Sequence, residues 1–199
     1  MTPMTWKSPE SMTAPLSDWI RPIQDWPEPG ILFRDLTPLW ADGQAWARAV
    51  QALARPFDPN PPALVMGVEA RGFLVAASLA ARWGAGIALA RKPGKLPAAS
   101  HREDYELEYG RASLESHRDL LRPGTRVLIA DDVLATGGTA RAALATVRAL
   151  GCLPVGFAFV VEIAFLKGRA SLGDAYPIHS VVAYDAQGNA AIREESGQA

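Results

Sequence analysis

One segment, Val127–Thr139, combines features that few local structures can accommodate. The apolar residues VLIA lead into Asp131 and Asp132, a turn of small residues follows, and a helical pattern begins near Thr139. A short apolar run bounded by turn signals is typical of a buried strand. Two adjacent glycines in the turn allow the backbone to adopt positive φ. The segment therefore predicts a strand, a tight loop and the start of a helix.

This strand–loop–helix unit predicts an anion site. Backbone N–H groups at a helix N-terminus have no partner within the helix, and the helix dipole there favours negative charge. Thr136 and Thr139 can add hydroxyl donors. The loop is not a Walker loop, because no Gly-Lys-Ser/Thr follows it. We expect it to bind a phosphate group.

The two aspartates indicate a second kind of ligand beside the phosphate. They follow a strand, and α/β sheets bind their ligands outside the carboxyl ends of strands. Because Asp131 and Asp132 would repel a bare phosphate, they must face another group, and sugar hydroxyls or Mg²⁺ would suit them. A Gly-Gly pair alone would favour a capped turn with surface aspartates. Two acids followed by Ala-Thr-Gly-Gly-Thr favour the ligand site instead.

The rest of the chain alternates short apolar runs with helical patterns, which predicts an α/β fold with a mostly parallel sheet flanked by helices. Helices are expected after two of the strands, ending at Gly84 and Gly151. The expected strands are Ala63–Val68, Gly86–Ala90, Arg126–Ala130, Val155–Ile163 and Ile178–Tyr184.

We predict a single domain over residues 19–185. Within it, residues 20–40 are rich in Pro, Asp and Trp and are expected to form a cap outside the sheet. Residues 1–18 are expected to be a poorly ordered extension, and the polar residues 186–199 a frayed tail.

Composition excludes several classes of function. A formal net charge of −1 gives no overall field to attract nucleic acid or an anionic membrane. The most apolar run, Leu153–Leu166, has 14 residues, fewer than the ~20 that a membrane-spanning helix needs. The single cysteine, Cys152, fits a reducing compartment, so a cytoplasmic location is expected. The three histidines are too scattered to predict a metal site.

Val127–Thr139 resembles the phosphoribosyl pyrophosphate motif of type I phosphoribosyltransferases. The resemblance implies the fold of that family, in which Asp131 and Asp132 contact the 2′ and 3′ hydroxyls of the ribose. It also implies that the loop after them holds the 5′-phosphate, through Ala135, Thr136, Gly137, Gly138 and Thr139.

Two segments resemble the base-binding parts of the adenine phosphoribosyltransferase family. In IQDWPEPGILFRDLT (23–37), the resemblance implies that Phe33 offers an aromatic face to adenine while the backbone of Leu32 and Arg34 bonds the ring edge. An isolated Phe33 would more simply be a core aromatic. In VVEIAFLKG (160–168), the resemblance implies that Ile163 packs on the other face of the base.

Basic residues in GVEARGF (67–73) and RKPGKLP (91–97) suit a polyphosphate, although Lys and Arg usually form solvated surface. Arg71 directly follows a buried strand, which argues for a binding role. The resemblance implies a pyrophosphate turn at 68–72 with an unusual peptide geometry between Glu69 and Ala70. The residues assigned to pyrophosphate are Glu69, Ala70, Arg71, Arg91, Lys92 and Lys95.

YELEYGRASLESH (105–117) resembles the mobile catalytic loop of the same family, and its alternating pattern predicts an exposed hairpin arm. The resemblance implies that Glu108 acts as acid/base at N7 of the base and that Tyr109 closes over the ribose. Without the resemblance, Glu108 would be an ordinary charged residue, no better a candidate than Glu106.

The resemblance spans Ile20–Tyr184 and matches less well at 97–104. It implies a purine-salvage enzyme that transfers the phosphoribosyl group to N9 of adenine, releasing AMP and pyrophosphate, with Glu108 and Arg71 catalytic. It also implies Mg²⁺ carried with the diphosphate, and a homodimer. The alternatives are a sister enzyme for another base and a regulator that senses phosphoribosyl pyrophosphate. The near-neutral charge argues against a nucleic-acid-binding regulator.

Overall fold

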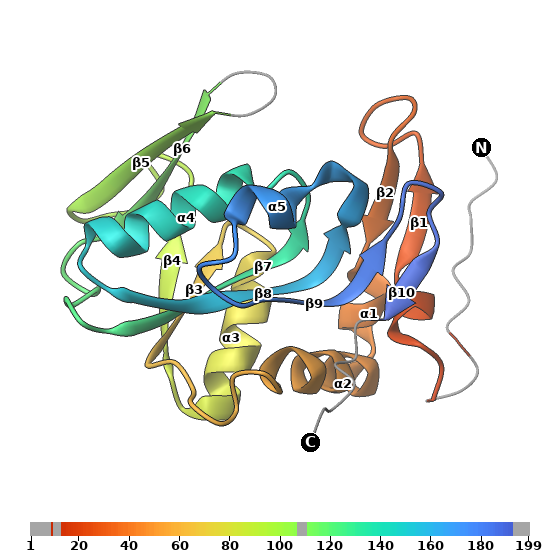
Figure 1. Ribbon diagram of the computed structural model, residues 1–199, viewed down its shortest axis with the longest axis horizontal. Helices are drawn as coiled ribbons and strands as arrows, with labels where there is room; N and C mark the ends of the chain where they lie inside the picture. Colours follow the sequence, from red (N-terminus) through yellow and green to blue (C-terminus); the bar gives the residue numbers. More distant parts are fainter. Residues whose placement is uncertain (1–8, 10–12, 107–110, 193–199) are drawn as a thin grey trace.

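The computed structural model describes residues 9, 13–106 and 111–192. At its centre is a six-stranded sheet in the order β10-β9-β8-β7-β3-β4 (Figure 1). All neighbouring strands are parallel except β10, which pairs antiparallel with β9. The predicted α/β fold with a mostly parallel sheet is therefore confirmed. The strands are β3 (Leu64–Val68), β4 (Gly86–Ala90), β7 (Arg126–Leu134), β8 (Leu153–Ile163), β9 (Ile178–Tyr184) and β10 (Ala190–Ile192).

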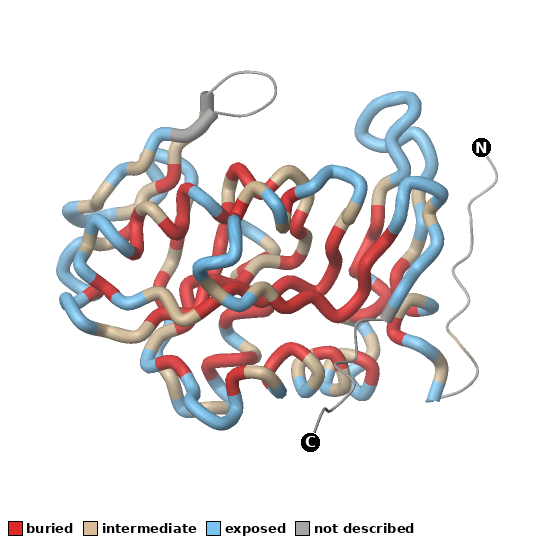
Figure 2. The backbone as a smooth tube through the Cα atoms, in the orientation of Figure 1, coloured by how far each residue is buried: buried red, intermediate tan, exposed pale blue. Residues whose placement is uncertain are grey.

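Helices cover both faces of this sheet. Helices α2 (Gly43–Ala54) and α3 (Gly72–Trp83) lie on one face, and α4 (Gly138–Ala149) and α5 (Gly168–Leu172) on the other (Figure 1). The central strands of the sheet are buried, as Figure 2 shows, and strand β7 illustrates the reason. Its residues alternate between the two cores, because successive side chains of a strand point to opposite faces. Leu128 and Ala130 pack with α2 and α3, whereas Val127 and Ile129 pack with α4.

Two small antiparallel hairpins lie outside the sheet. Strands β1 (Arg21–Gln24) and β2 (Leu32–Asp35), followed by α1 (Thr37–Ala41), form the predicted cap. Strands β5 (Ser100–Glu106) and β6 (Arg111–His117) form the predicted arm. The hairpins rise from opposite ends of the molecule on the same side as α4 and α5 (Figure 1).

Strand β7 is longer than predicted, which changes the setting of the aspartate pair. The sequence predicted a strand ending at Ala130, but β7 continues to Leu134. Its pairing with β3 stops at Gly67 opposite Ala130, whereas its pairing with β8 continues to Glu162. Within the sheet the extension pairs with β8 alone, because the chain after β3 turns away into α3.

Both ends of the described chain differ from the expectations of disorder. Leu16–Trp19 forms a 3₁₀ helix, η1, whose Leu16 and Trp19 are buried in the core. Residues 190–192, expected in a frayed tail, form β10 against the open edge of β9. The turn before β10 is fixed by Asp185, whose carboxylate accepts hydrogen bonds from the backbone N–H groups of Gln187 and Asn189. No described helix is both long enough and apolar enough to cross a membrane.

Candidate functional site

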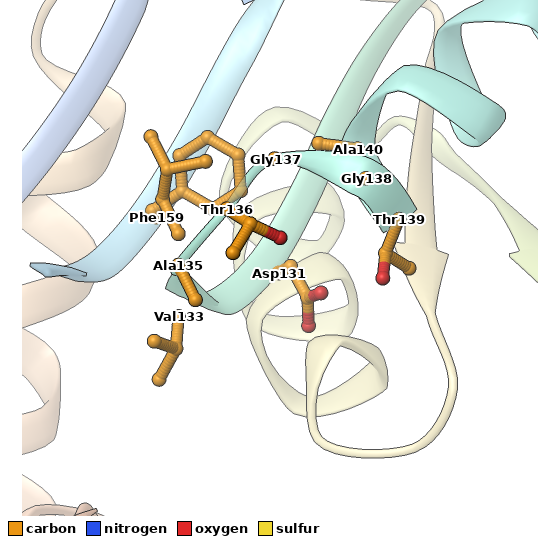
Figure 3. Close-up of a pocket in the computed structure, with 10 residues that line it drawn as sticks. Asp131, Val133, Ala135, Thr136, Gly137, Gly138, Thr139, Ala140 and Phe159 are labelled. Atoms are coloured by element: carbon orange, nitrogen blue, oxygen red, sulfur yellow. The ribbon is translucent and has the colours of Figure 1, made fainter. Parts of the chain in front are cut away.

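A pocket opens where β7 and β8 end and α4 begins, on the predicted phosphate loop. Figure 3 shows oxygen atoms of Asp131, Thr136 and Thr139 on one side of this loop. The structure therefore brings the first aspartate of the pair and the loop hydroxyls together around one space. The lining residues are Asp131, Val133, Leu134, Ala135, Thr136, Gly137, Gly138, Thr139, Ala140 and Phe159.

The loop has a shape that only glycine permits at one position. Gly137, at the N-terminus of α4, has φ of +85°, in the left-handed region. A Cβ atom there would lie 2.2 Å from Ser171 Oγ and 2.9 Å from the Gly168 carbonyl oxygen. A Cβ on Gly168 would lie 2.2 Å from the Ala135 carbonyl oxygen. The phosphate loop thus packs directly on α5, a contact that the sequence did not indicate.

The aspartate pair lies beside this loop and beside Arg71. Asp132 is buried, and its Oδ2 lies 2.8 Å from Arg71 Nε. This contact is an ion pair without hydrogen-bond geometry, so Oδ2 has no hydrogen-bond partner among the described residues. Asp131 accepts a hydrogen bond of 2.9 Å from the Asp132 N–H. An unbonded, buried carboxylate oxygen is an acceptor for a hydroxyl or water that the chain does not supply.

Burial controls the protonation of both aspartates. Burial raises the pKa of Asp131 well above its usual value, and the neighbouring charge of Asp132 raises it further. Burial also raises the pKa of Asp132, although the Arg71 guanidinium opposes this rise. Two carboxylates this close repel each other when both are ionised. A ligand that donates hydrogen bonds to them or brings a cation is therefore favoured.

The turn at 69–72 approaches β7 closely. The peptide bond between Glu69 and Ala70 is cis, the unusual geometry that the sequence resemblance implied. A Cβ atom on Gly72 would lie 2.7 Å from Asp131 Oδ1 and 2.9 Å from the Ala130 carbonyl oxygen. The absence of a side chain at Gly72 therefore lets α3 start against the strand that carries the aspartates.

The basic loop that begins at Arg91 is held by Glu69. The Glu69 carboxylate accepts hydrogen bonds from Arg91 Nε (3.2 Å) and the Lys92 N–H (2.9 Å). Burial alone would raise the pKa of Glu69, but the Lys92 N–H and the Arg91 guanidinium outweigh it and lower that pKa. Arg91 also donates to the Lys95 carbonyl oxygen at 2.8 Å. The Lys92 and Lys95 residues are exposed. The Glu69 side chain thus shapes the loop.

The base-binding candidates lie on the cap and at the end of β8. The ring of Phe33 packs on Trp26, with centroids 4.3 Å apart, and the Arg71 guanidinium lies 5.4 Å from its centroid. Leu32 is exposed, and Ile163 is half-buried at the last position of β8. Phe33 is therefore linked to the arginine beside the aspartate pair, which joins the cap to the rest of the site.

The side chain of Arg34 faces the carboxyl-terminal turn. Its guanidinium lies 3.7 Å from the centroid of the Tyr184 ring and donates a 3.0 Å hydrogen bond to the Gly188 carbonyl oxygen. Burial lowers the pKa of Arg34, and the effect of Tyr184 opposes this shift. Because these contacts occupy the guanidinium, the backbone of Arg34 is the part suited to a ligand.

Two predicted site residues, Glu108 and Tyr109, lie outside the described residues, between β5 and β6. Sequence reasoning missed Gly168 and Ser171, which touch the phosphate loop from α5. Neither has a sequence signal of its own, because each contact joins positions more than thirty residues apart. Among the described residues, no group of three or more His, Cys, Asp or Glu side chains could hold a metal ion.

Known proteins are similar to this chain in both sequence and fold. The model of the phosphoribosyl transferase domain family matches residues 41–181. The adenine phosphoribosyltransferase of Sorangium cellulosum is 52% identical over 171 residues, which cover 84% of this chain and 86% of the relative. That of Thermobifida fusca is 51% identical over 156 residues, or 78% of this chain and 89% of the relative.

Two solved structures of adenine phosphoribosyltransferases are also similar to this chain. The adenine phosphoribosyltransferase of Rhodothermus marinus is 43% identical with a TM-score of 0.81, over 84% of this chain and 96% of the other. The enzyme of Saccharomyces cerevisiae, complexed with an imino-altritol bisphosphate and adenine, is 33% identical with a TM-score of 0.77, over 83% of this chain and 95% of the other.

Proposed function

The chain belongs to the adenine phosphoribosyltransferase family, and we propose that the residues gathered at the carboxyl end of its sheet carry out the reaction of that family. The enzyme serves purine salvage by forming AMP from adenine and phosphoribosyl pyrophosphate. The observation that carries the assignment of residues is the acid pair Asp131–Asp132, with its unbonded Oδ2, between a glycine-shaped anion loop and Arg71.

The phosphoribosyl group binds along β7 and the loop after it. Asp131 and Asp132 accept hydrogen bonds from the 2′ and 3′ hydroxyls, which supply the donors that Asp132 Oδ2 lacks. The 5′-phosphate lies at the N-terminus of α4, where backbone N–H groups and the helix dipole favour an anion. The residues that surround it are Ala135, Thr136, Gly137, Gly138 and Thr139.

Pyrophosphate leaves toward the basic side of the site. Arg71, Lys92 and Lys95 neutralise it directly, and Arg91 does so from a position fixed by Glu69. The backbone of Glu69 and Ala70 forms the turn that faces it. Mg²⁺ would arrive with the substrate as its diphosphate complex and would help to neutralise the leaving group, and Asp131 and Asp132 would be the carboxylates able to act on it indirectly.

Adenine lies between the cap and the end of β8. Phe33 contacts one face of the base and Ile163 the other, while the backbone of Leu32 and Arg34 bonds its edge. Adenine carries an exocyclic amino donor where 6-oxopurines carry a carbonyl acceptor, so backbone carbonyl groups favour adenine. The side-chain contacts of Arg34 with Tyr184 and Gly188 support this backbone role.

In the reaction, N9 of adenine forms a bond to C1′ of the ribose with inversion, and the bond from C1′ to the pyrophosphate oxygen breaks. Positive charge develops on the sugar and negative charge on the leaving group, so the main requirement is electrostatic stabilisation. Arg71 is well placed to stabilise the negative charge of the leaving group, because it lies beside Asp132, which contacts the ribose. Glu108 accepts the proton from N7, a contribution of ~10²–10⁴-fold for groups of this kind. Tyr109 closes over the ribose.

The first test is AMP formation from adenine, phosphoribosyl pyrophosphate and Mg²⁺, run beside hypoxanthine, guanine, xanthine and orotate. An exclusive response to adenine is expected. A preference for another base would overturn the roles of Phe33 and Ile163 while leaving the phosphate site intact. Binding of phosphoribosyl pyrophosphate without turnover of any base would instead favour a regulator.

A second test addresses the acid/base. Glu108→Gln should lower kcat by about 10²-fold or more, whereas Glu106→Gln, a carboxylate two residues away, should leave kcat within about twofold. Equal losses in both variants would refute the assignment of Glu108.

We also propose that the enzyme is a cytoplasmic homodimer. Its only cysteine, Cys152, is buried, and burial raises the pKa of its thiol, both of which suit a free cysteine in a reducing compartment. Light scattering coupled to size-exclusion chromatography should give twice the mass of one chain. A mass of one chain at micromolar concentration would exclude the dimer.

A further inference from the structure

The short helix α5 supports the phosphate loop through Ser171. The Ser171 hydroxyl lies 2.8 Å from the Thr136 carbonyl oxygen and 2.8 Å from the Gly168 carbonyl oxygen, so its one proton is shared between them. The facing loop residue is Gly137, where a Cβ atom would lie 2.2 Å from this hydroxyl. The hydroxyl and the loop backbone are thus in direct contact.

Helix α5 has a firm attachment of its own. Arg169 forms two hydrogen bonds with the Glu162 carboxylate, of 3.1 Å from Nε and 2.6 Å from Nη2, and a third of 2.7 Å with the Ile178 carbonyl oxygen. The Ser180 hydroxyl donates to the same carboxylate at 2.7 Å. The Glu162 side chain is only 4% exposed. A buried, bidentate ion pair holds its geometry well, so α5 is fixed to β8 and β9 rather than free to follow the loop.

The bond to Thr136 determines which way a loop peptide faces. In a trans peptide the carbonyl and the following N–H point in opposite directions, and the bond between Thr136 and Gly137 is not among the cis bonds of the described chain. Because Ser171 holds the Thr136 carbonyl toward α5, the Gly137 N–H faces away from α5. If this peptide turned over, a carbonyl oxygen would replace an N–H donor on the side away from α5, and it would repel an anion.

We propose that Ser171 is a positioning residue for the 5′-phosphate. Its hydroxyl fixes the peptide between Thr136 and Gly137 so that the Gly137 N–H donates to the phosphate. The inference rests on the proposed function, in which this loop binds the 5′-phosphate. It adds a residue outside the loop that acts on phosphate binding without touching the substrate.

The test compares Ser171→Ala and Ser171→Thr in both directions of the reaction. Ser171→Ala should raise KM for phosphoribosyl pyrophosphate and for AMP by about 3- to 10-fold, the range for one lost hydrogen bond. KM for adenine and for pyrophosphate should stay unchanged, because neither carries a 5′-phosphate. Ser171→Thr keeps the hydroxyl and should restore both values.

Ser78→Ala is the matched control. The Ser78 hydroxyl also bonds a carbonyl of its own helix, that of Leu74 at 2.9 Å, and accepts a hydrogen bond from Trp46, but it lies on α3 away from the loop. This variant should leave all four KM values unchanged. A rise in all four KM values in Ser171→Ala, or no rise at all, would overturn the inference.

Gly137→Ala separates the inference from the proposed function. This variant strains the loop itself and should raise KM for both 5′-phosphate substrates. If Gly137→Ala raises them and Ser171→Ala does not, only the role of Ser171 fails. If neither variant changes them, the loop is not the 5′-phosphate site and the proposed assignment fails with it.

Discussion

Replacing Gly72 by alanine tests whether close packing of α3 on β7 sets the position of the acid pair. The new Cβ atom would lie 2.7 Å from Asp131 Oδ1 and 2.9 Å from the Ala130 carbonyl oxygen. Ordinary contacts begin near 3.4 Å, so the helix and strand must separate by about 0.7 Å at this point. Because one of the two contacts is backbone, a change of side-chain rotamer cannot relieve both.

The expected cost follows from this separation. Overpacking of a close contact typically lowers the free energy of unfolding by about 1–3 kcal/mol. For a domain of this size, each kcal/mol corresponds to about 2–4 °C in Tm, so Tm should fall by about 2–12 °C. Because misplacement of reacting groups by ~1 Å can cost ~10²-fold in rate, kcat/KM for phosphoribosyl pyrophosphate should fall on the order of tenfold or more.

The assays are calorimetric unfolding and initial rates of AMP formation. Gly43→Ala is the matched control, because Gly43 also begins a helix but has nothing within 4 Å of its hypothetical Cβ and no positive φ. Alanine there should be neutral, or raise stability by about 0.4–1 kcal/mol through the unfolded state. If Gly72→Ala matched Gly43→Ala in both Tm and kcat/KM, close packing would not position Asp131.

Three further predictions concern single side chains. Asp131→Asn should raise Tm at pH 7, because the pKa of Asp131 is raised in the folded protein: the carboxyl contributes fully to stability below its unfolded pKa of about 3.9, and this contribution is lost as pH rises through the folded pKa. The gain in Tm over wild type should therefore shrink as the pH of a Tm series approaches 4, and a gain that stayed constant with pH would contradict the burial argument. The same variant should lower kcat/KM at pH 7 at least about tenfold. Arg34→Lys loses the planar contact of the guanidinium with Tyr184. Because the contacts of Arg34 with the Tyr184 ring and the Gly188 carbonyl oxygen are together worth about 1–2 kcal/mol, KM for adenine should rise about 5- to 20-fold in steady-state assays, while KM for phosphoribosyl pyrophosphate stays unchanged. Glu115→Ala removes the carboxylate that accepts the Gly94 N–H at 3.0 Å and should raise KM for pyrophosphate about threefold in the reverse reaction, whereas Glu103→Ala on the same hairpin should not; equal effects would assign the change to the hairpin as a whole.

The sequence determined the order of the main elements, because their signals are local. The predicted strands at 86–90 and 178–184 have the observed bounds, and α3 ends where Gly84 adopts the left-handed conformation that only a residue without Cβ takes easily. The acid pair and the glycine-rich loop were also visible, because their residues are adjacent in the chain. The short apolar runs of the buried strands can likewise be recognised without knowing which strands they pair with.

Only the tertiary structure decided which distant groups complete the site. Ser171 lies 35 positions from the Thr136 carbonyl that it bonds, and Arg34 lies 154 positions from Gly188. Strand β10 formed because β9 had an open edge and Asp185 closed a turn, although the composition of that segment favoured a frayed tail. The motif predicts that Glu69 belongs to the pyrophosphate turn, but only the structure shows that its carboxylate accepts hydrogen bonds from the Arg91 loop. A residue's type limits the bonds that it can make, but the choice among those bonds depends on what packing brings within about 3 Å.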